Sequence, residues 1–72
     1  MLKEGYYITR GYYIAHLTEG AIGKRGAMGV VKDFGLVAYD RNGIFPYKDE
    51  HKDIGDAFDL VLESWTTENI WK

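Results

Sequence analysis

Four of the six tyrosines stand in a short repeat near the N-terminus, and they are the residues best suited to binding chemistry. The tetrapeptide Gly-Tyr-Tyr-Ile occurs at 5–8 and again at 11–14. Its tyrosines are Tyr6, Tyr7, Tyr12 and Tyr13. Tyrosine offers a large, rigid contact area with a polar end and is enriched at the energetic centres of protein interfaces. These four tyrosines are therefore the predicted partner-binding residues.

The spacing of the repeat bears on how the tyrosines are presented. The offset of six residues is even, so in one continuous strand the first tyrosine of each pair lies on one face and the second on the other. A hairpin that turns at Arg10-Gly11 is the alternative, but Arg-Gly is a weaker turn signal than Asn-Gly. We predict one long Tyr-rich strand over 5–17, in which one tyrosine pair is at least partly exposed because one helix cannot cover both faces of a sheet.

A glycine-rich stretch at 18–29 carries the second candidate site. Glycine stands at positions 20, 23, 26 and 29, with Lys24 and Arg25 between the second and third of them. Backbone amides of glycine-rich loops cradle phosphates, and basic side chains bind them. The P-loop motif is not met, because position 18 is threonine and position 25 is arginine. We predict a loop here, with Lys24 and Arg25 as the residues able to contact phosphate or nucleic acid.

The remaining reactive residues do not form a recognisable active site. His16 and His51 are the two histidines, and the acidic residues of 49–53 around the second have no ligand spacing typical of a metal site. The tripeptide Asp-Phe-Gly at 33–35 matches part of a kinase motif, but 72 residues cannot hold the other kinase parts. With no cysteine and no nucleophile motif, the sequence predicts no catalytic residue, no metal ligand, no cofactor and no enzymatic activity.

The elements that must position these residues change character near residue 50. From 28 to 48, short apolar runs alternate with turns, and Asn42-Gly43 is the strongest hairpin signal, with a return strand at 44–47 that should end at or near Pro46. From 53 to 66 the apolar residues recur at helical spacing behind a capping aspartate. These apolar residues are Ile54, Ala57, Phe58, Val61, Leu62 and Trp65.

The charge changes at the same place. Residues 1–48 carry seven basic and four acidic side chains, a net +3, whereas residues 49–72 carry two basic and seven acidic ones, a net −5. The basic residues 1–48, whose pattern predicts strands, are thus followed by the acidic residues 49–72, whose pattern predicts a helix. We predict an α+β fold, with a small curved antiparallel sheet of three or four strands packed by one C-terminal amphipathic helix over 53–66.

An alternative arrangement is a small barrel. A first strand, a long glycine-containing loop, Gly29-Val30-Val31 and a tight hairpin follow one another in an order that resembles SH3-type small barrels, here with a C-terminal helix added. The resemblance rests on spacing and on residues common in any sheet. It implies a fold and no particular function.

Length and composition narrow the function. The 72 residues are 46% hydrophobic and 28% charged, and we expect one domain over 1–72. No apolar run approaches the roughly 18 residues of a membrane helix, and the N-terminus lacks a signal-peptide core, so we expect a cytoplasmic protein without a membrane partner. The sequence predicts a non-catalytic protein-interaction module that binds a protein partner, or a second copy of itself in a homodimer, through a Tyr-rich sheet face or edge.

The alternative function is nucleic-acid binding. Lys24 and Arg25 would contact the phosphates, Arg10, Lys32 and Arg41 would add a basic rim, and surface tyrosines would stack on bases. The net charge of −2 and the pI of about 5.5 disfavour this alternative.

Overall fold

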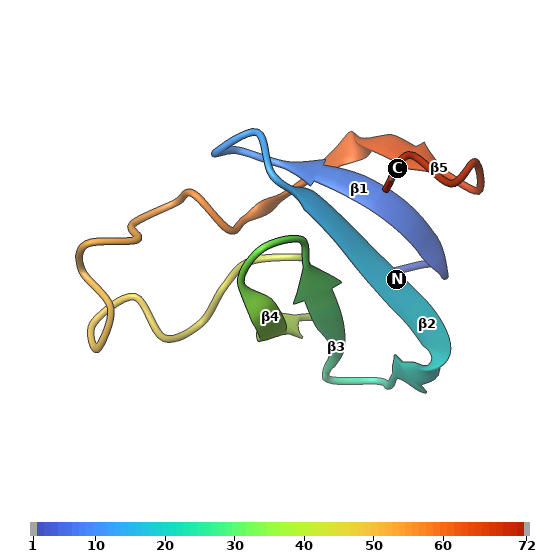
Figure 1. Ribbon diagram of the computed structural model, residues 1–72. Helices are drawn as coiled ribbons and strands as arrows, with labels where there is room; N and C mark the ends of the chain where they lie inside the picture. The colour runs from blue at the N-terminus through green and yellow to red at the C-terminus, as the bar shows by residue number, and fades with distance from the viewer. Residues whose placement is uncertain (1, 72) are drawn as a thin grey trace.

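The computed structural model describes residues 2–71, which form a five-stranded antiparallel sheet (Figure 1). The strands are β1 (Gly5–Thr9), β2 (Ile14–Ile22), β3 (Gly26–Val31), β4 (Gly35–Asp40) and β5 (Leu60–Thr66). Their order across the sheet is β4-β3-β2-β1-β5. The first four strands form a meander, and β5 returns beside β1 after the long connection 41–59, which extends to the left in Figure 1.

The two ends of this order approach each other. Leu60, at the start of β5, donates its amide to the carbonyl of Gly43 at 2.9 Å, and Gly43 lies three residues beyond the end of β4. The sheet therefore curls around one of its faces. That inner face holds the core, and the connection 41–59 leaves and rejoins the sheet on either side of this hydrogen bond.

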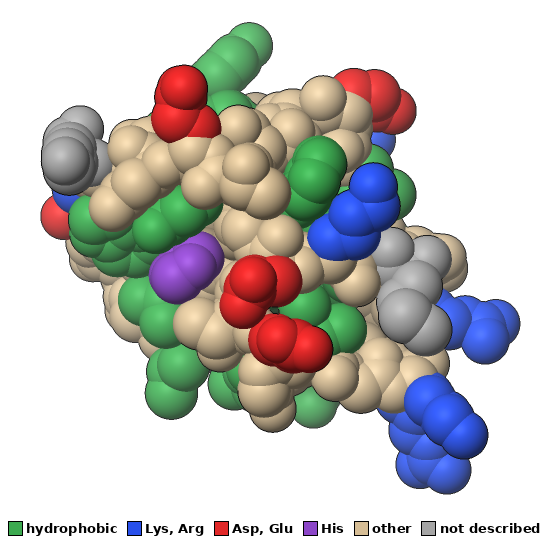
Figure 2. Space-filling view, turned by 90° about the vertical axis from the view of Figure 1, so that its right-hand side faces the viewer, with side chains coloured by type: hydrophobic (Ala, Val, Ile, Leu, Met, Phe, Trp, Pro, Cys, Tyr) green, Lys and Arg blue, Asp and Glu red, His purple; other side chains and the backbone are tan. Residues whose placement is uncertain are grey.

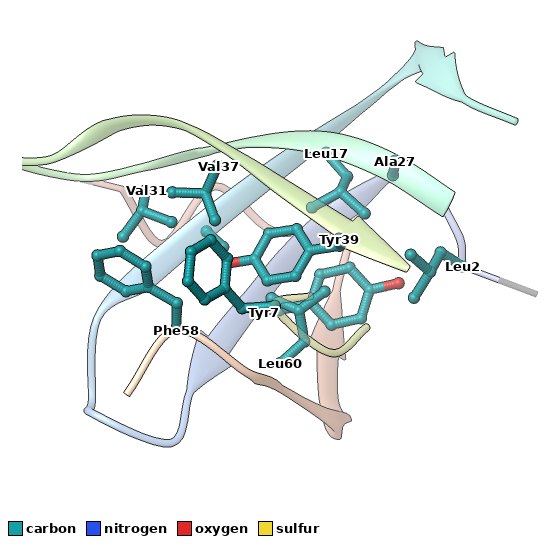
Figure 3. Packing of buried hydrophobic residues seen from close by; sticks show 11 residues of the cluster. Leu2, Tyr7, Leu17, Ala27, Val31, Val37, Tyr39, Phe58 and Leu60 are labelled. Atoms are coloured by element: carbon teal, nitrogen blue, oxygen red, sulfur yellow. The ribbon is translucent and has the colours of Figure 1, made fainter. Parts of the chain in front are cut away.

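Alternating residues of the strands fill the inner face (Figure 3). In β1 the buried positions are every second residue, and β3 and β4 follow the same alternation. Leu2 and Phe58 lie toward opposite ends of the cluster, with the ring of Tyr39 between them. The buried hydrophobic residues are Leu2, Tyr7, Ala15, Leu17, Ala27, Val31, Val37, Tyr39, Phe45, Phe58 and Leu60.

The predicted α+β class is wrong, because residues 2–71 contain no helix and the fold is all-β. The helix expected over 53–66, whether packed on an open sheet or added to an SH3-like barrel, is replaced by consecutive turns and by β5. In the turns, amides bond to carbonyls three residues back, as Ala57 does to Ile54 at 3.0 Å. Gly55 takes a φ of 55°, which interrupts a right-handed helix.

The stretch 5–17 is a hairpin and not the single strand that the repeat predicts. Thr9 holds its turn, since its amide donates to the Tyr13 carbonyl at 2.8 Å and its hydroxyl accepts the Tyr13 amide at 3.0 Å. Tyr12 supplies the positive φ of 67°, and Gly11 lets the turn approach Ala57, where a Cβ would come within 2.9 Å. The turn is therefore set by contacts distant in sequence that the dipeptide Arg-Gly does not reveal.

Other predicted boundaries also change. The stretch 18–29 is mostly strand, because β2 reaches Ile22 and β3 starts at Gly26. Within 28–48, the tight connection between β3 and β4 lies at 32–34, where Asp33 takes a φ of 75°. Asn42-Gly43 does form a turn, but no strand follows it over 44–47.

Candidate interaction surface

The structure separates the four predicted tyrosines. Tyr7 is buried in the core, and its hydroxyl bonds to both the amide and the carbonyl of Lys3 at 3.0 Å. Tyr13 is half-buried, with its ring 4.7 Å from that of Phe34 in an edge-on contact. Tyr12 is 89% exposed in the hairpin turn.

Tyr6 is the one tyrosine of the four on the outer face of the sheet. Its ring stacks on His16 at 4.2 Å with an 8° angle between the planes. The strand registers place these two residues in a row that crosses all five strands. From β4 to β5 the row reads Leu36, Val30, His16, Tyr6 and Thr66.

The tail after β5 folds over the middle of this row. Trp71 meets His16 edge-on at 6.5 Å, and its carbonyl accepts a hydrogen bond of 2.6 Å from Lys32 Nζ. The β3–β4 side of the row stays open, with Leu36 73% exposed and Val30 and Met28 also exposed. We call Met28, Val30 and Leu36 the outer apolar patch.

The free edge of β4 presents backbone groups without partners. Asp40 donates its amide to the Ile44 carbonyl and accepts the Gly43 amide, both at 2.9 Å, so both groups point away from β3. Because these groups alternate in direction along a strand, the N–H and C=O groups of Leu36 and Ala38 also point away from β3. Within residues 2–71, no backbone hydrogen bond from outside the sheet reaches Leu36 or Ala38.

The other edge of the sheet, on β5, is irregular. Tyr6 pairs with Thr66 and Ile8 with Val61, so two steps along β1 correspond to five along β5. The Ser64 hydroxyl enters the ladder and accepts the Ile8 amide at 2.7 Å. Such a bulge disrupts the flat row of backbone groups that a further strand would need. Of the two edges, β4 is the one suited to strand addition.

The predicted phosphate contacts lie together and gain a third cation. Lys24 and Arg25 occupy the turn between β2 and β3, and with Arg41 they line a hollow of about 250 Å³. Asp40 also lines it, but its carboxylate accepts the amides of Asn42 and Ile44 at 2.8 and 3.0 Å. Arg10 and Lys32, the other members of the predicted rim, do not line this hollow.

The Lys and Arg side chains in view gather mainly at one side of the molecule. In Figure 2 the largest group of them lies at the lower right, apart from the acidic side chains. None of the ion pairs within residues 2–71 involves the three cations of the hollow. Their charges are thus available to an anion.

The ionisable residues of the long connection 41–59 have structural contacts. Asp59 is buried and its carboxylate accepts the Phe45 amide at 2.9 Å and Lys48 Nζ at 2.7 Å. Lys48 also pairs with Asp56 at 2.9 Å. The hydrogen bond to Asp59 and then the one to Asp56 raise the pKa of Lys48, and Lys48 lowers the pKa of Asp56.

The histidines are likewise engaged with aromatic rings, His16 with Tyr6 and His51 with Phe45 at 5.9 Å. Over residues 2–71 there is no group of three or more His, Cys, Asp or Glu side chains placed to hold a metal ion. The Asp-Phe-Gly tripeptide forms the β3–β4 turn and the start of β4.

Comparisons with protein-family models, with curated proteins and with solved structures found no match. In the part of the chain described, no helix is long and apolar enough to cross a membrane.

The sequence prediction did not identify the free edge of β4, because it expected a strand beside it. A return strand at 44–47 would have paired with β4 and covered it. The run Leu36-Val37-Ala38-Tyr39 contains no charge, proline or glycine, which natural edge strands often carry to block pairing. That lack, together with Pro46 in the expected covering strand, is the signal by which the edge could have been found.

Proposed function

We propose that this protein is a non-catalytic interaction module that binds an extended strand of a protein partner along the free edge of β4. The unpaired backbone groups of Leu36 and Ala38 carry the proposal. Strand addition uses main-chain hydrogen bonds for affinity and side-chain contacts on alternate residues for specificity. The tyrosines, which the structure disperses, have no part in this binding.

The side chains beside the edge favour the same use. Leu36 stands on the edge strand itself, and the outer apolar patch continues behind it onto β3. An uncharged edge next to exposed apolar side chains offers both parts of strand recognition, and exposed apolar clusters on small proteins commonly mark binding sites.

A proline substitution tests the edge selectively. Ala38→Pro removes an amide that faces away from β3, so it deletes a donor to the partner and keeps the β3–β4 ladder. Leu36→Lys adds the charge that natural edges use against pairing. The matched control is Leu62→Lys, which alters an exposed leucine on the β5 edge.

The readout combines capture with hydrogen exchange. A partner held by the wild type should be lost with Ala38→Pro and Leu36→Lys and kept with Leu62→Lys. In the complex, the amides of Leu36 and Ala38 should become protected from exchange. Strand addition would be refuted if Ala38→Pro and Leu36→Lys both still captured the partner. It would also be refuted if the amides protected from exchange lay outside β4.

Nucleic-acid binding is a second candidate, and the hollow lined by Lys24, Arg25 and Arg41 favours it. Three phosphate contacts on a single strand predict a slope of log affinity against log salt of about −2. Replacing the three cations by alanine should abolish the anisotropy change of a labelled oligonucleotide, whereas Lys52→Ala on the exposed connection should not. Absence of binding at low salt would exclude this function.

A further inference from the structure

We propose that the strand added to β4 is the β4 of a second copy, running antiparallel about a two-fold axis at Val37. This inference rests on the proposed strand addition and goes further by naming the partner and the register. The result is a ten-stranded sheet that continues from one copy into the other. Three features of the β4 edge lead to it.

The first feature is the extent of the free edge. The backbone groups of Asp40 are engaged by Ile44 and Gly43, and residues 32–34 form the turn before β4. The free groups are therefore confined to Leu36 and Ala38, one on each side of Val37.

This arrangement is complementary to itself. With the axis at Val37, Leu36 lies opposite Ala38 of the partner subunit, and the reverse pair follows by symmetry. Each pair exchanges both of its N–H···O bonds, as hydrogen-bonded antiparallel pairs do. No free group of Leu36 or Ala38 is left over in either copy.

The second feature is the side chains that this register aligns. On the outer face Val30 lies opposite Leu36 and Met28 opposite Ala38. Across the new edge, Leu36 meets Ala38 of the partner subunit, beyond which lies Met28 of the partner subunit. These four side chains, Val30, Leu36, Ala38 of the partner subunit and Met28 of the partner subunit, are all apolar and join the outer apolar patches of the two copies. Apolar cross-strand neighbours stabilise a sheet.

The third feature is charge. Asp33 precedes β4 and Arg41 follows it, both are exposed, and neither takes part in an ion pair within residues 2–71. An antiparallel copy places Asp33 beside Arg41 of the partner subunit, and symmetry repeats the contact. A parallel copy would instead bring like charges together. The charges thus select the antiparallel direction.

The alternative contact between copies, β4 against β5, is disfavoured. The bulged β5 edge lacks a regular row of backbone groups, as its register on β1 shows. Such a contact would also be head-to-tail, which builds rings or open chains and not a closed pair.

Charge reversal tests the register directly. Asp33→Arg gives a chain with arginine at both positions, and Arg41→Asp gives one with aspartate at both. Each variant alone should associate at least about tenfold more weakly than the wild type, because like charges then face each other twice. A mixture of the two variants should form heterodimers, because both contacts are then complementary.

Sedimentation velocity measures the outcome. The wild type should shift with rising concentration from the monomer mass of 8.2 kDa to twice that mass, and Leu36→Lys should stay monomeric. As a control, Glu63→Arg alone should associate as the wild type does, since Glu63 lies on β5. Loss of association in Glu63→Arg, or failure of the Asp33→Arg and Arg41→Asp mixture to associate, would overturn the register.

The result separates this inference from the proposed function. A wild type that remains at 8.2 kDa up to millimolar concentration overturns self-pairing. If capture of another protein then still depends on Leu36 and Ala38, strand addition at β4 stands with a different partner. If neither association nor such capture occurs, both proposals fail.

Discussion

Removing the hydroxyl of Tyr39 should stabilise this protein, whereas the same change at Tyr7 should destabilise it. Tyr39 is 4% exposed and its hydroxyl has no hydrogen-bond partner among the described residues. The hydroxyl of Tyr7 is bonded to the amide and the carbonyl of Lys3, each at 3.0 Å. The two substitutions remove the same atom from a ring in the same core, so their difference isolates the hydrogen bonding.

The magnitudes follow from the two environments. A buried hydroxyl without a partner costs about 1–3 kcal/mol relative to water, so removing it stabilises the fold. The small void that Tyr39→Phe leaves is destabilising and offsets only part of that stabilisation. We expect the free energy of unfolding to rise by about 1 kcal/mol. Tyr7→Phe should lower it by about 1 kcal/mol, since two hydrogen bonds at a partly exposed site are lost.

Urea and thermal unfolding measure both changes. For a domain of this size, about 1 kcal/mol corresponds to a shift of the midpoint temperature of roughly 4–8 °C, upward for Tyr39→Phe and downward for Tyr7→Phe. Equal destabilisation by both substitutions would show that the Tyr39 hydroxyl makes a favourable interaction in the folded protein, and the reasoning would be refuted.

Alkaline pH offers a second test at the same residue. Burial, and secondarily the negative charge of Asp59, raise the pKa of Tyr39 above its ordinary value of about 10. The pKa of Tyr39 is higher in the folded than in the unfolded protein. The contribution of neutral Tyr39 to the free energy of unfolding is therefore fully present below pH ~10, and it is lost as the pH rises above that value, because the tyrosine then ionises in the unfolded chain. The stability advantage of Tyr39→Phe over the wild type should therefore widen above pH ~10, and a constant gap would contradict the assignment.

Three further predictions concern other contacts, each measured by urea unfolding. Asp59→Ala, which leaves Lys48 without its shorter ion-pair contact and one amide unbonded, should cost about 2–4 kcal/mol. Gly26→Ala should cost roughly 2–4 kcal/mol because its Cβ would overlap the backbone of β4, whereas Gly20→Ala, with open space around it, should change stability by less than about 0.5 kcal/mol. Trp71→Ala should cost about 1 kcal/mol through its lost packing on the outer face.

The strand regions were predictable where the signal is local. The β3–β4 hairpin matches the two short apolar runs on either side of the tripeptide at 33–35, and Asn42-Gly43 does turn the chain. Antiparallel pairing of short strands followed from the short connections between them. These features depend on neighbours a few residues apart, which a sequence displays directly.

The positions of the four tyrosines of the repeat were not predictable, because they depend on a contact distant in sequence. The even spacing of the repeat puts matching tyrosines on one face only if the chain stays extended through 10–13. Gly11 instead donates its amide to the Ala57 carbonyl at 2.8 Å, a contact forty-six residues along the chain. Tyr7 is buried on β1 and Tyr12 is exposed in the turn, and the periodicity within 5–17 does not indicate that turn.

The helix failed for a related reason. Leu62, one residue of the expected apolar stripe, is exposed. Ile54 and Phe58 pack in or against the core from the turns, and Leu60 and Trp65 do so from β5, so they lie on two separate elements. Asp59 divides them, since its buried carboxylate bonds to the Phe45 amide and to Lys48. A helix through this point would carry the carboxylate away from the Phe45 amide, and β1 would lose the strand that covers its edge.

The open edge of β4 is a consequence of how the core is closed. Phe45 and Phe58 pack edge-on at 5.8 Å and close one end of the curled sheet, and Asp59 fixes Phe45 through its amide. Residues 44–47 cannot both make these contacts and run back along β4. The contacts that complete a small core therefore leave the outer edge of the uncharged run 36–39 without a neighbouring strand, so the stability of the monomer and the availability of the edge have the same origin.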